Sequence, residues 1–259
     1  MQILFGFIVF IFGTIIGSFL NVVLLRKNTG KSLVFGGSKC FSCGKNLSAR
    51  ELIPILSFLR QRGKCFHCGS KISWQYPLVE FLTGLIAISV YSQVGLGFSM
   101  AFYFVAFAAL FLVSAYDFKH KIIDSQLLYI FGAFAVVVFF LRGNYLSDII
   151  SSASIALFFY LLWFFSGGKW MGRGDTDVSF FISLFLGFPL NLSSIILSFW
   201  IGGIWAIILL LLSQIERRFI SRRFHLKSEI PLAPFMALAA FFSWFFSSPL
   251  LFLLDKLFF

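Results

Sequence analysis

Long apolar runs recur along this chain and govern how it can fold. Seven runs are long enough to cross the roughly 30 Å hydrocarbon core of a bilayer, and they cover residues 3–25, 77–94, 98–116, 126–141, 149–165, 193–212 and 231–254. Of the 259 residues, 59% are hydrophobic and only 12% are charged, a balance that excludes an ordinary soluble domain. Backbone in lipid must satisfy its own hydrogen bonds, so each run is expected to be helical. The sequence therefore predicts an all-α polytopic membrane protein.

An eighth apolar stretch, residues 178–189, is short enough to be re-entrant instead of spanning. The basic residues favour one alternative, because lysine and arginine collect in cytoplasmic loops. If this stretch spans, 19 of the 21 basic residues lie inside and only Arg142 and Lys256 lie outside. If it does not span, the basic residues from Arg217 to Lys227 move outside and the asymmetry weakens. We therefore predict about eight transmembrane helices with both termini outside.

The net charge of +11 is explained by this sorting. The basic stretch 215–227 also carries interleaved apolar side chains, which favours contact with anionic lipid headgroups over nucleic acid. The first run lacks the basic start and cleavage site of a signal peptide, so it is interpreted as a retained span. Within it, Gly13-x-x-x-Gly17 has the spacing that lets two helices pack closely. The expected surroundings are the lipid bilayer, with no nucleic-acid partner.

The polar segment 26–76 follows the first run on the predicted cytoplasmic side and holds every cysteine of the chain. They form two C-x-x-C pairs, Cys40 with Cys43 and Cys65 with Cys68. Two such pairs favour one tetrahedral zinc site with four thiolate ligands, and that site would be structural because no position stays open for water. Disulfides and redox-active pairs are the alternatives, and a cytoplasmic location argues against disulfides.

A histidine within the second pair, His67, could replace a cysteine, although a solvent-facing role is the simpler interpretation. A polar segment of this size is small for an independent hydrophobic core, which also favours a metal. The predicted organisation is a first transmembrane helix over residues 1–25, a cytoplasmic tetracysteine zinc subdomain over residues 26–76 and a seven-helix membrane domain over residues 77–259.

A costly charge stands between two apolar runs, where Asp175 follows Gly172-Arg173-Gly174. An ionisable group at such a place is a candidate functional residue. The two glycines permit positive φ or close approach of another segment. Asp117 ends the third run and should reach the same depth on the same side, so the two carboxylates can share a site and a proton, as in an aspartyl protease. The alternative is a set of interfacial charges that only cap helices.

Helix polarity suggests Asp175 as the base and Asp117 as the acid of such a pair. Three further carboxylates, Glu80, Asp124 and Asp177, also lie near predicted cytoplasmic boundaries. Asp148, on the outer side, is interpreted as a helix N-cap.

Several of these segments together resemble the type IV prepilin leader peptidases, a family of membrane aspartyl proteases of the GxGD type. The resemblance covers nearly the whole chain, and no single motif in it is decisive. The matching segments are Gly17-Ser18-Phe19-Leu20-Asn21-Val22-Val23, the cysteine pairs with Gly63-Lys64-Cys65, Tyr76-Pro77-Leu78-Val79-Glu80, Asp117, Gly172-x-Gly174-Asp175 and Ile230-Pro231-x-x-Pro234-Phe235.

The resemblance implies that Asp117 and Asp175 are the catalytic residues, with Gly172 and Gly174 in support. It implies cleavage of the short basic leader of type IV prepilins or pseudopilins at the cytoplasmic face of the bacterial inner membrane. Many family members also methylate the new N-terminus with S-adenosylmethionine, and the residues themselves show no pocket for that cofactor. We assign Glu80 to support of the cysteine subdomain or to the substrate's positive N-terminus, against simple interfacial placement.

Three departures from the family pattern bear on activity. Where a Pro-Asp pair is usual, this chain has Asp124-Ser125, so that either the proline is deleted or Asp124 and Ser125 replace Pro and Asp. Asp177 replaces a lysine, and Pro231-Leu232-Ala233-Pro234 replaces Pro-Phe-Gly-Pro. An alternative function is therefore a non-catalytic membrane assembly factor that binds pilin helices. A metal transporter is a second rival, but it would need metal ligands within the spans.

Overall fold

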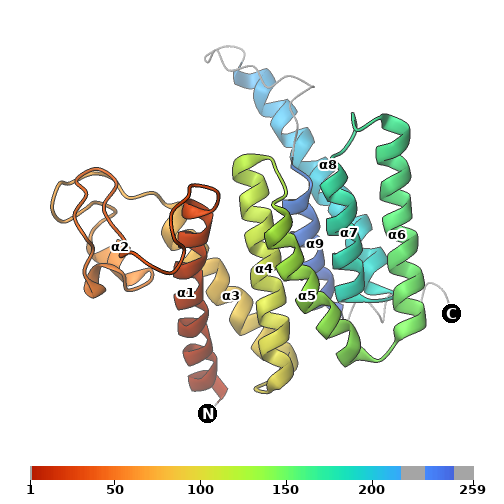
Figure 1. Ribbon diagram of the computed structural model, residues 1–259, viewed down its shortest axis with the longest axis horizontal. Helices are drawn as coiled ribbons and strands as arrows, with labels where there is room; N and C mark the ends of the chain where they lie inside the picture. Colours follow the sequence, from red (N-terminus) through yellow and green to blue (C-terminus); the bar gives the residue numbers. More distant parts are fainter. Residues whose placement is uncertain (1, 217–230, 248–259) are drawn as a thin grey trace. The chain divides into compact units, whose positions relative to one another are not determined.

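The computed structural model describes residues 2–216 and 231–247 of the chain (Figure 1). These residues form α-helices, one short 3-10 helix and two isolated β-bridges, without any strand. The chain divides into two compact units, Met1–Phe104 and Val105–Phe259. The predicted all-α class is confirmed for the described residues.

Six described helices are long and apolar enough to cross a membrane, which supports a multi-pass membrane protein. Their membrane-capable segments are Ile3–Arg26, Gln75–Val94, Phe98–His120, Ser125–Arg142, Tyr145–Ser166 and Leu190–Leu212. The prediction was eight. The sixth predicted span is the 14-residue helix α7 (Arg173–Leu186), and the last contains the 13-residue helix α9 (Ala233–Phe245). The described residues do not include residues 248–254 of that last span, the basic stretch 217–227 or Lys256.

In the first unit, α1 (Gln2–Arg26) packs closely against α3 (Gln75–Val94). A Cβ on Gly13 would lie 2.6 Å from the Cβ of Ala87, and one on Gly17 would lie 2.8 Å from the Cα of Glu80. Real side chains do not approach so closely, so only glycine permits this helix separation. The prediction that the Gly13-x-x-x-Gly17 pattern serves helix packing is confirmed.

The segment between α1 and α3 has little regular structure. It holds the 3-10 helix η1 (Ala49–Glu51) and the short helix α2 (Leu56–Arg60). Arg26, at the end of α1, donates to the carbonyl oxygens of Ser32 and Gly36 at 2.9 and 3.1 Å. These bonds fold the start of the segment back onto the end of α1.

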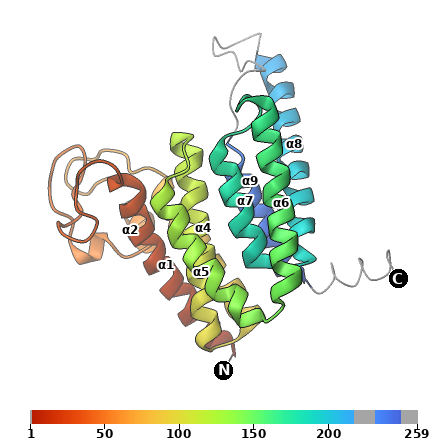
Figure 2. The same ribbon diagram turned by 45° about the vertical axis from the view of Figure 1, so that its right-hand side comes forward.

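In the second unit, α7 lies among its neighbours and has the most buried polar face. The other helices are α4 (Phe98–His120), which begins in the first unit, α5 (Ser125–Arg142), α6 (Tyr145–Ser166), α8 (Leu190–Glu216) and α9. Helix α7 contacts α5, α6, α8 and α9 (Figures 1 and 2).

Aromatic side chains fill the interior of this unit. The ring of Phe185 on α7 lies 4.8 Å from that of Phe107 on α4 and 5.9 Å from that of Phe131 on α5, measured between centroids. Phe107 also meets Phe241 of α9 at 5.6 Å. Edge-to-face rings at such separations gain energy beyond simple burial. This packing holds α7 laterally between α4, α5 and α9.

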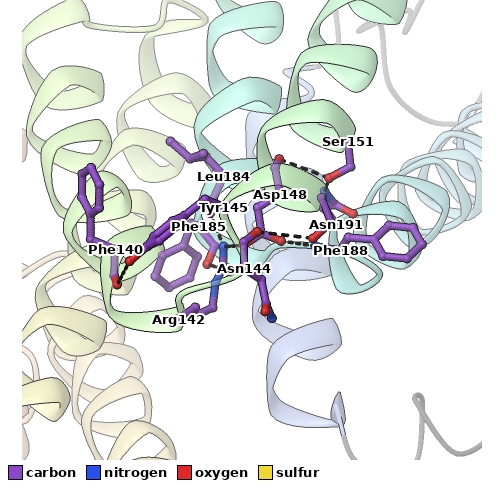
Figure 3. Close-up of polar contacts among 11 residues, drawn as sticks. Phe140, Arg142, Asn144, Tyr145, Asp148, Ser151, Leu184, Phe185, Phe188 and Asn191 are labelled. Carbon is purple, nitrogen blue, oxygen red and sulfur yellow. Dashed lines mark hydrogen bonds and ion pairs between the residues drawn. The ribbon is translucent and has the colours of Figure 1, made fainter.

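The role predicted for Asp148 is wrong. The N-cap of α6 is Asn144, and Asp148 is the fourth residue of the helix, in its first turn, where its carboxylate pairs with Arg142 at 2.7 Å (Figure 3). An N-cap residue and a buried ion-pair residue look alike in the sequence, because each is a polar residue near a helix start. Only the position of the first helical residue distinguishes them.

Candidate active site and metal centre

Asp175 lies in the first turn of α7, the third residue of that helix. Its side chain is 8% exposed, and its Oδ2 accepts the backbone N–H of Gly172 at 3.1 Å. Gly172 is the N-cap of α7, so the carboxylate folds back over the start of its own helix. A carboxylate is favoured there, because the first N–H groups of a helix have no partner within it.

Asp117 lies in the last turn of α4 and is only 4% exposed. The negative charges of Asp117 and Asp175 are close enough to interact electrostatically, so the two ends of α4 and α7 bring the predicted pair together. The Ala233 backbone N–H, at the start of α9, also interacts with the Asp117 carboxylate. The Oδ2 of Asp117 is buried and has no hydrogen-bond partner among the described residues.

The two glycines before Asp175 have different surroundings. A Cβ on Gly174 would lie 3.0 Å from the Cδ1 and 3.1 Å from the Cβ of Ile123, in the connection between α4 and α5. A Cβ on Gly172 would meet nothing closer than Asp175 Oδ2 at 3.6 Å. Neither has the positive φ that the sequence allowed, and the φ of Gly172 is −74°. The close approach of Ile123 therefore explains the glycine at position 174, but nothing similar explains the glycine at position 172.

The acidic departures from the family pattern occupy ordinary helix positions. The Asp124 carboxylate accepts the backbone N–H groups of Gln126 and Leu127, both at 3.1 Å, and so caps α5. Asp177 is exposed on α7. Residues two apart do not face the same way on a helix, so Asp177 points away from the face that carries Asp175.

The four cysteines lie together, with their sulfur atoms all within 4.8 Å of one another. Each C-x-x-C pair makes the same turn. The N–H of Gly44 bonds the Cys40 carbonyl oxygen at 2.9 Å, and the N–H of Gly69 bonds that of Cys65 at 3.0 Å. Both glycines have a φ of 71°, a conformation that residues with a Cβ rarely adopt.

The spacing of the sulfurs fits a tetrahedral zinc ion. Four thiolates at the usual Zn–S distance of about 2.3 Å are separated by roughly 3.8 Å along each edge of the tetrahedron. The Sγ atoms of Cys40 and Cys68 are 3.8 Å apart, far beyond the length of a disulfide bond. All four thiols are free.

Hydrogen bonds favour the thiolate form that a metal requires at Cys40 and Cys68, but not at Cys43. Although the backbone N–H of Lys45 lowers it, the pKa of Cys43 is raised to about 11 by the side chain of Cys40 and by burial. The backbone N–H of Cys43, followed by the hydroxyl of Ser70, lowers the pKa of Cys40 to about 6. The same hydroxyl is the main cause that lowers the pKa of Cys68. Ser70 is thus a supporting residue that the cysteine pattern alone did not reveal.

His67 stands outside the sulfur cluster. Its Nδ1 lies 3.0 Å from Lys45 Nζ, and its Nε2 lies 3.9 Å from a carboxylate oxygen of Glu51. This agrees with the interpretation of His67 as a solvent-facing residue. Glu51 itself accepts both the backbone N–H and the hydroxyl of Ser48 at 2.8 Å, which lower its pKa.

Glu80 is buried in α3, and its carboxylate holds the tetracysteine segment. The Oε2 atom accepts the backbone N–H of Ile55 at 2.7 Å, and Ser18 of α1 also donates to the carboxylate. Ile55 has a φ of 60° and a ψ of −52°, and it is the centre of a three-residue turn in which the Leu56 N–H bonds the Pro54 carbonyl oxygen. Such γ-turns are strained and need support from their surroundings.

Two family models match the chain. The bacterial peptidase A24 N-terminal domain matches residues 11–94, and the type IV leader peptidase family matches residues 104–207. The first match contains all four cysteines and Glu80, and the second contains Asp117 and Asp175. The two matches therefore divide the cysteine segment from the aspartate pair.

Curated relatives cover most of the chain. A prepilin leader peptidase/N-methyltransferase of Bacillus subtilis is 26% identical over 246 residues, which cover 94% of this chain and 95% of the relative. One of Myxococcus xanthus is 30% identical, over 80% of this chain and 64% of the relative. One of Aeromonas hydrophila is 28% identical, over 90% and 87% respectively. No solved structure matches the chain.

Proposed function

Because this chain belongs to the type IV leader peptidase family, we propose that it is a membrane aspartyl endopeptidase that cleaves the basic leader of type IV prepilins or pseudopilins. The observation that carries the proposal is the pair of buried, interacting carboxylates at the ends of α4 and α7. Buried carboxylates in lipid-spanning helices are costly, and a catalytic role accounts for that cost.

In the proposed mechanism, Asp117 and Asp175 act on a water molecule and the scissile peptide bond. The ionised member removes a proton from the water, whose oxygen attacks the carbonyl carbon, and the protonated member gives its proton to the departing nitrogen. The unpartnered Oδ2 of Asp117 offers a free acceptor for the water. Each aspartate interacts with a backbone N–H at a helix start, so helix polarity no longer separates base from acid.

We assign zinc to the four cysteines as a structural ion. The edge of 3.8 Å between Cys40 and Cys68, with all four sulfurs close together, supports a closed tetrahedral site. When bound, the ion links two turns that are far apart in sequence and stabilises the segment 26–76. The proposed domain organisation, residues 1–25, 26–76 and 77–259, follows chain order, and it differs from the two compact units because α3 packs against α1 in the first unit.

We assign Glu80 to support of this segment, not to the substrate. Its carboxylate already accepts the Ile55 N–H and the Ser18 hydroxyl. A buried acceptor that holds a strained turn has a structural task without any substrate.

Methylation of the new N-terminus is the second activity in the names of the relatives. We extend the proposal to this activity, with S-adenosylmethionine as methyl donor, on the basis of those names alone. The mass of a mature pilin N-terminus would report cleavage and any added methyl group together.

The proposed topology has eight spans, with α7 as the sixth and α9 within the last. The α7–α8 connection meets α6 near its first turn, because the Phe188 N–H bonds Asp148 at 2.9 Å. Helix α7 follows the end of α6 in the chain, and the residue just after it contacts the start of α6, which supports the proposal that α7 crosses the same layer as α6. In the bacterial inner membrane this topology places both termini outside and the aspartates at the cytoplasmic face.

The decisive experiment incubates the purified protein with a prepilin and follows loss of the leader by mass spectrometry. Asp117→Asn and Asp175→Asn should each reduce cleavage at least about 1,000-fold, since members of a catalytic unit are individually essential. Asp177→Asn is the matched control, because it removes an exposed carboxylate from the same helix.

Full cleavage by either catalytic variant would refute the mechanism. The alternative function, a non-catalytic assembly factor, predicts that the wild-type protein binds the prepilin but leaves its leader intact.

A further inference from the structure

A buried ion pair joins the ends of α5 and α6. Arg142, the last residue of α5, places its Nη2 2.7 Å from Oδ2 of Asp148 in α6 (Figure 3). Their side chains are 18% and 2% exposed, respectively. Neither residue belongs to the proposed catalytic pair or to the cysteine cluster, so a buried charge pair here needs its own explanation.

The same guanidinium group also holds the end of α7. It donates to the carbonyl oxygen of Leu184 at 2.7 Å and to that of Phe185. The last carbonyl groups of a helix have no partner within it, and a positive charge there is favourable. Arg142 therefore caps α7 from a different helix.

The partner carboxylate holds the chain immediately after α7. Asp148 Oδ1 accepts the backbone N–H of Phe188 at 2.9 Å. Between these contacts lies Gly187, with a φ of 72°, where a Cβ would be 2.7 Å from both Arg142 Cζ and Asp148 Oδ1. The ion pair thus packs directly on the backbone of the α7–α8 connection.

All these contacts are to backbone atoms of α7 and its connection, so they fix where the helix lies along its own axis. Apolar packing resists such sliding less, because rings and aliphatic groups can exchange neighbours. Helix α7 has 14 residues, which corresponds to about 21 Å at 1.5 Å per residue. Asp175 is at its opposite end, and a short helix transmits the position of one end to the other.

We propose that Arg142 and Asp148 form a positioning pair that fixes the axial register of α7 and thereby places Asp175 beside Asp117. The catalytic consequence rests on the proposed peptidase function, whereas the register does not. A pair that served only folding would change stability without moving the cytoplasmic end of α7.

The test measures that movement directly in the full-length protein. Lys119 on α4 and Asp177 on α7 are both exposed and are replaced by p-acetylphenylalanine, which carries spin labels without involving the native cysteines. Double electron–electron resonance then gives the distribution of distances between the labels. The variant is the double substitution Arg142→Met with Asp148→Asn, which leaves no unpaired buried charge and retains an acceptor for the Phe188 N–H.

Tyr145→Phe is the matched control. Its hydroxyl bonds the Phe140 carbonyl oxygen at 3.4 Å beside the same α5–α6 connection and takes no part in the Arg142–Asp148 ion pair (Figure 3). Arg142→Lys is a second variant that keeps the charge pair but lacks the planar fork that reaches two carbonyl groups. It covers the case in which the double variant does not fold.

The expected result is a shifted or broadened distance distribution in the double variant, a smaller change in Arg142→Lys and none in Tyr145→Phe. In unlabelled protein, kcat for prepilin cleavage should fall about 10- to 100-fold with KM within about twofold, as small misplacements of catalytic groups do. A distribution identical to that of the control overturns the proposal, whatever the loss of stability. A wild-type protein that does not cleave refutes the peptidase function, and the distances still decide the role of the pair.

Discussion

Gly172 and Gly174 both lie just before Asp175, yet only Gly174 has a neighbour that requires glycine. Ile123 lies next to the place that a Cβ on Gly174 would occupy, whereas the space beside Gly172 is open except for Asp175 itself. The Ile123 side chain comes from the connection that follows Asp117, so this contact sets how near the two aspartate-bearing segments lie. Positions 172 and 174 should therefore respond differently to the same added methyl group.

Gly174→Ala should lower the rate of prepilin cleavage by about tenfold, because a displacement of a few tenths of an ångström next to Asp175, the proposed catalytic carboxylate, is costly. Gly172→Ala should lower it less, since the new Cβ meets only ordinary contacts. Initial rates at saturating prepilin, with both proteins at equal concentration, measure the difference. Equal loss in the two variants would contradict the role given to Ile123.

The two aspartates of the candidate site could be predicted from the sequence, but the contacts that support them could not. Asp117 and Asp175 are conspicuous because charges are rare near apolar runs, and helix topology places them at one depth. The contact of Ile123 with Gly174 depends on a loop path that no local pattern specifies. Arg142 and Asp148 were visible as charges on either side of a short connection, but their bonds to α7 depend on where that helix ends.

Besides the bonds from Arg26 at its start, the tetracysteine segment is held by a sulfur cluster and by the Glu80 carboxylate. Little other regular structure is present in it. Long connections of this kind lose much conformational entropy on ordering, so a metal that closes them stabilises the segment substantially. The two contacts can be removed separately.

Zinc removal should unfold this segment while leaving the apolar helices formed. The purified protein should contain one zinc ion per chain, and Cys40→Ser or Cys68→Ser should remove it. Limited proteolysis should then cut within residues 26–76, while far-ultraviolet circular dichroism keeps most of its helical signal. Ser42→Ala, in the same turn but not a ligand, is the control. Full metal content in the cysteine variants would exclude the four-thiolate site.

Substitution of Glu80 should loosen the same segment by a different route. Glu80→Met leaves the Ile55 N–H without its acceptor, which costs about 1–3 kcal/mol of local stability. Glu80→Gln keeps an oxygen acceptor of the same length and should cost less. Proteolysis rates within residues 26–76 measure both variants. A substrate-binding role would instead raise KM for prepilins in both variants, with proteolysis unchanged.

Helices were predictable from the apolar runs, and their lengths were less so. The described spans match the predicted runs because lipid exposure requires continuous apolar surface. Helix α7 is the exception, since its buried face carries Asp175, Thr176, Ser179 and Ser183. Asp175 and Thr176 shorten its apolar run to residues 178–189, and that short length raised the alternative of a re-entrant segment. In the structure, four other helices contact α7.

The orientation of the whole chain in the membrane depends on whether α7 crosses. If it does, the α7–α8 connection and the α3–α4 connection lie on one side, and the α6–α7 connection lies on the other. A single cysteine replaces Gly97 in the α3–α4 connection, Lys169 in the α6–α7 connection or Phe188 in the α7–α8 connection. All three residues are exposed. The native cysteines lie on the predicted cytoplasmic side, where they do not meet an external reagent.

In intact cells made permeable only at the outer membrane, a membrane-impermeant maleimide should label Gly97→Cys and Phe188→Cys. Lys169→Cys should react only after the inner membrane is opened, because the proposed topology puts it on the cytoplasmic side together with the aspartates. Labelling of Gly97→Cys without Phe188→Cys would mean that α7 turns back within the bilayer. In that case α8 would cross in the opposite direction, and the basic stretch 217–227 would lie outside against the positive-inside rule.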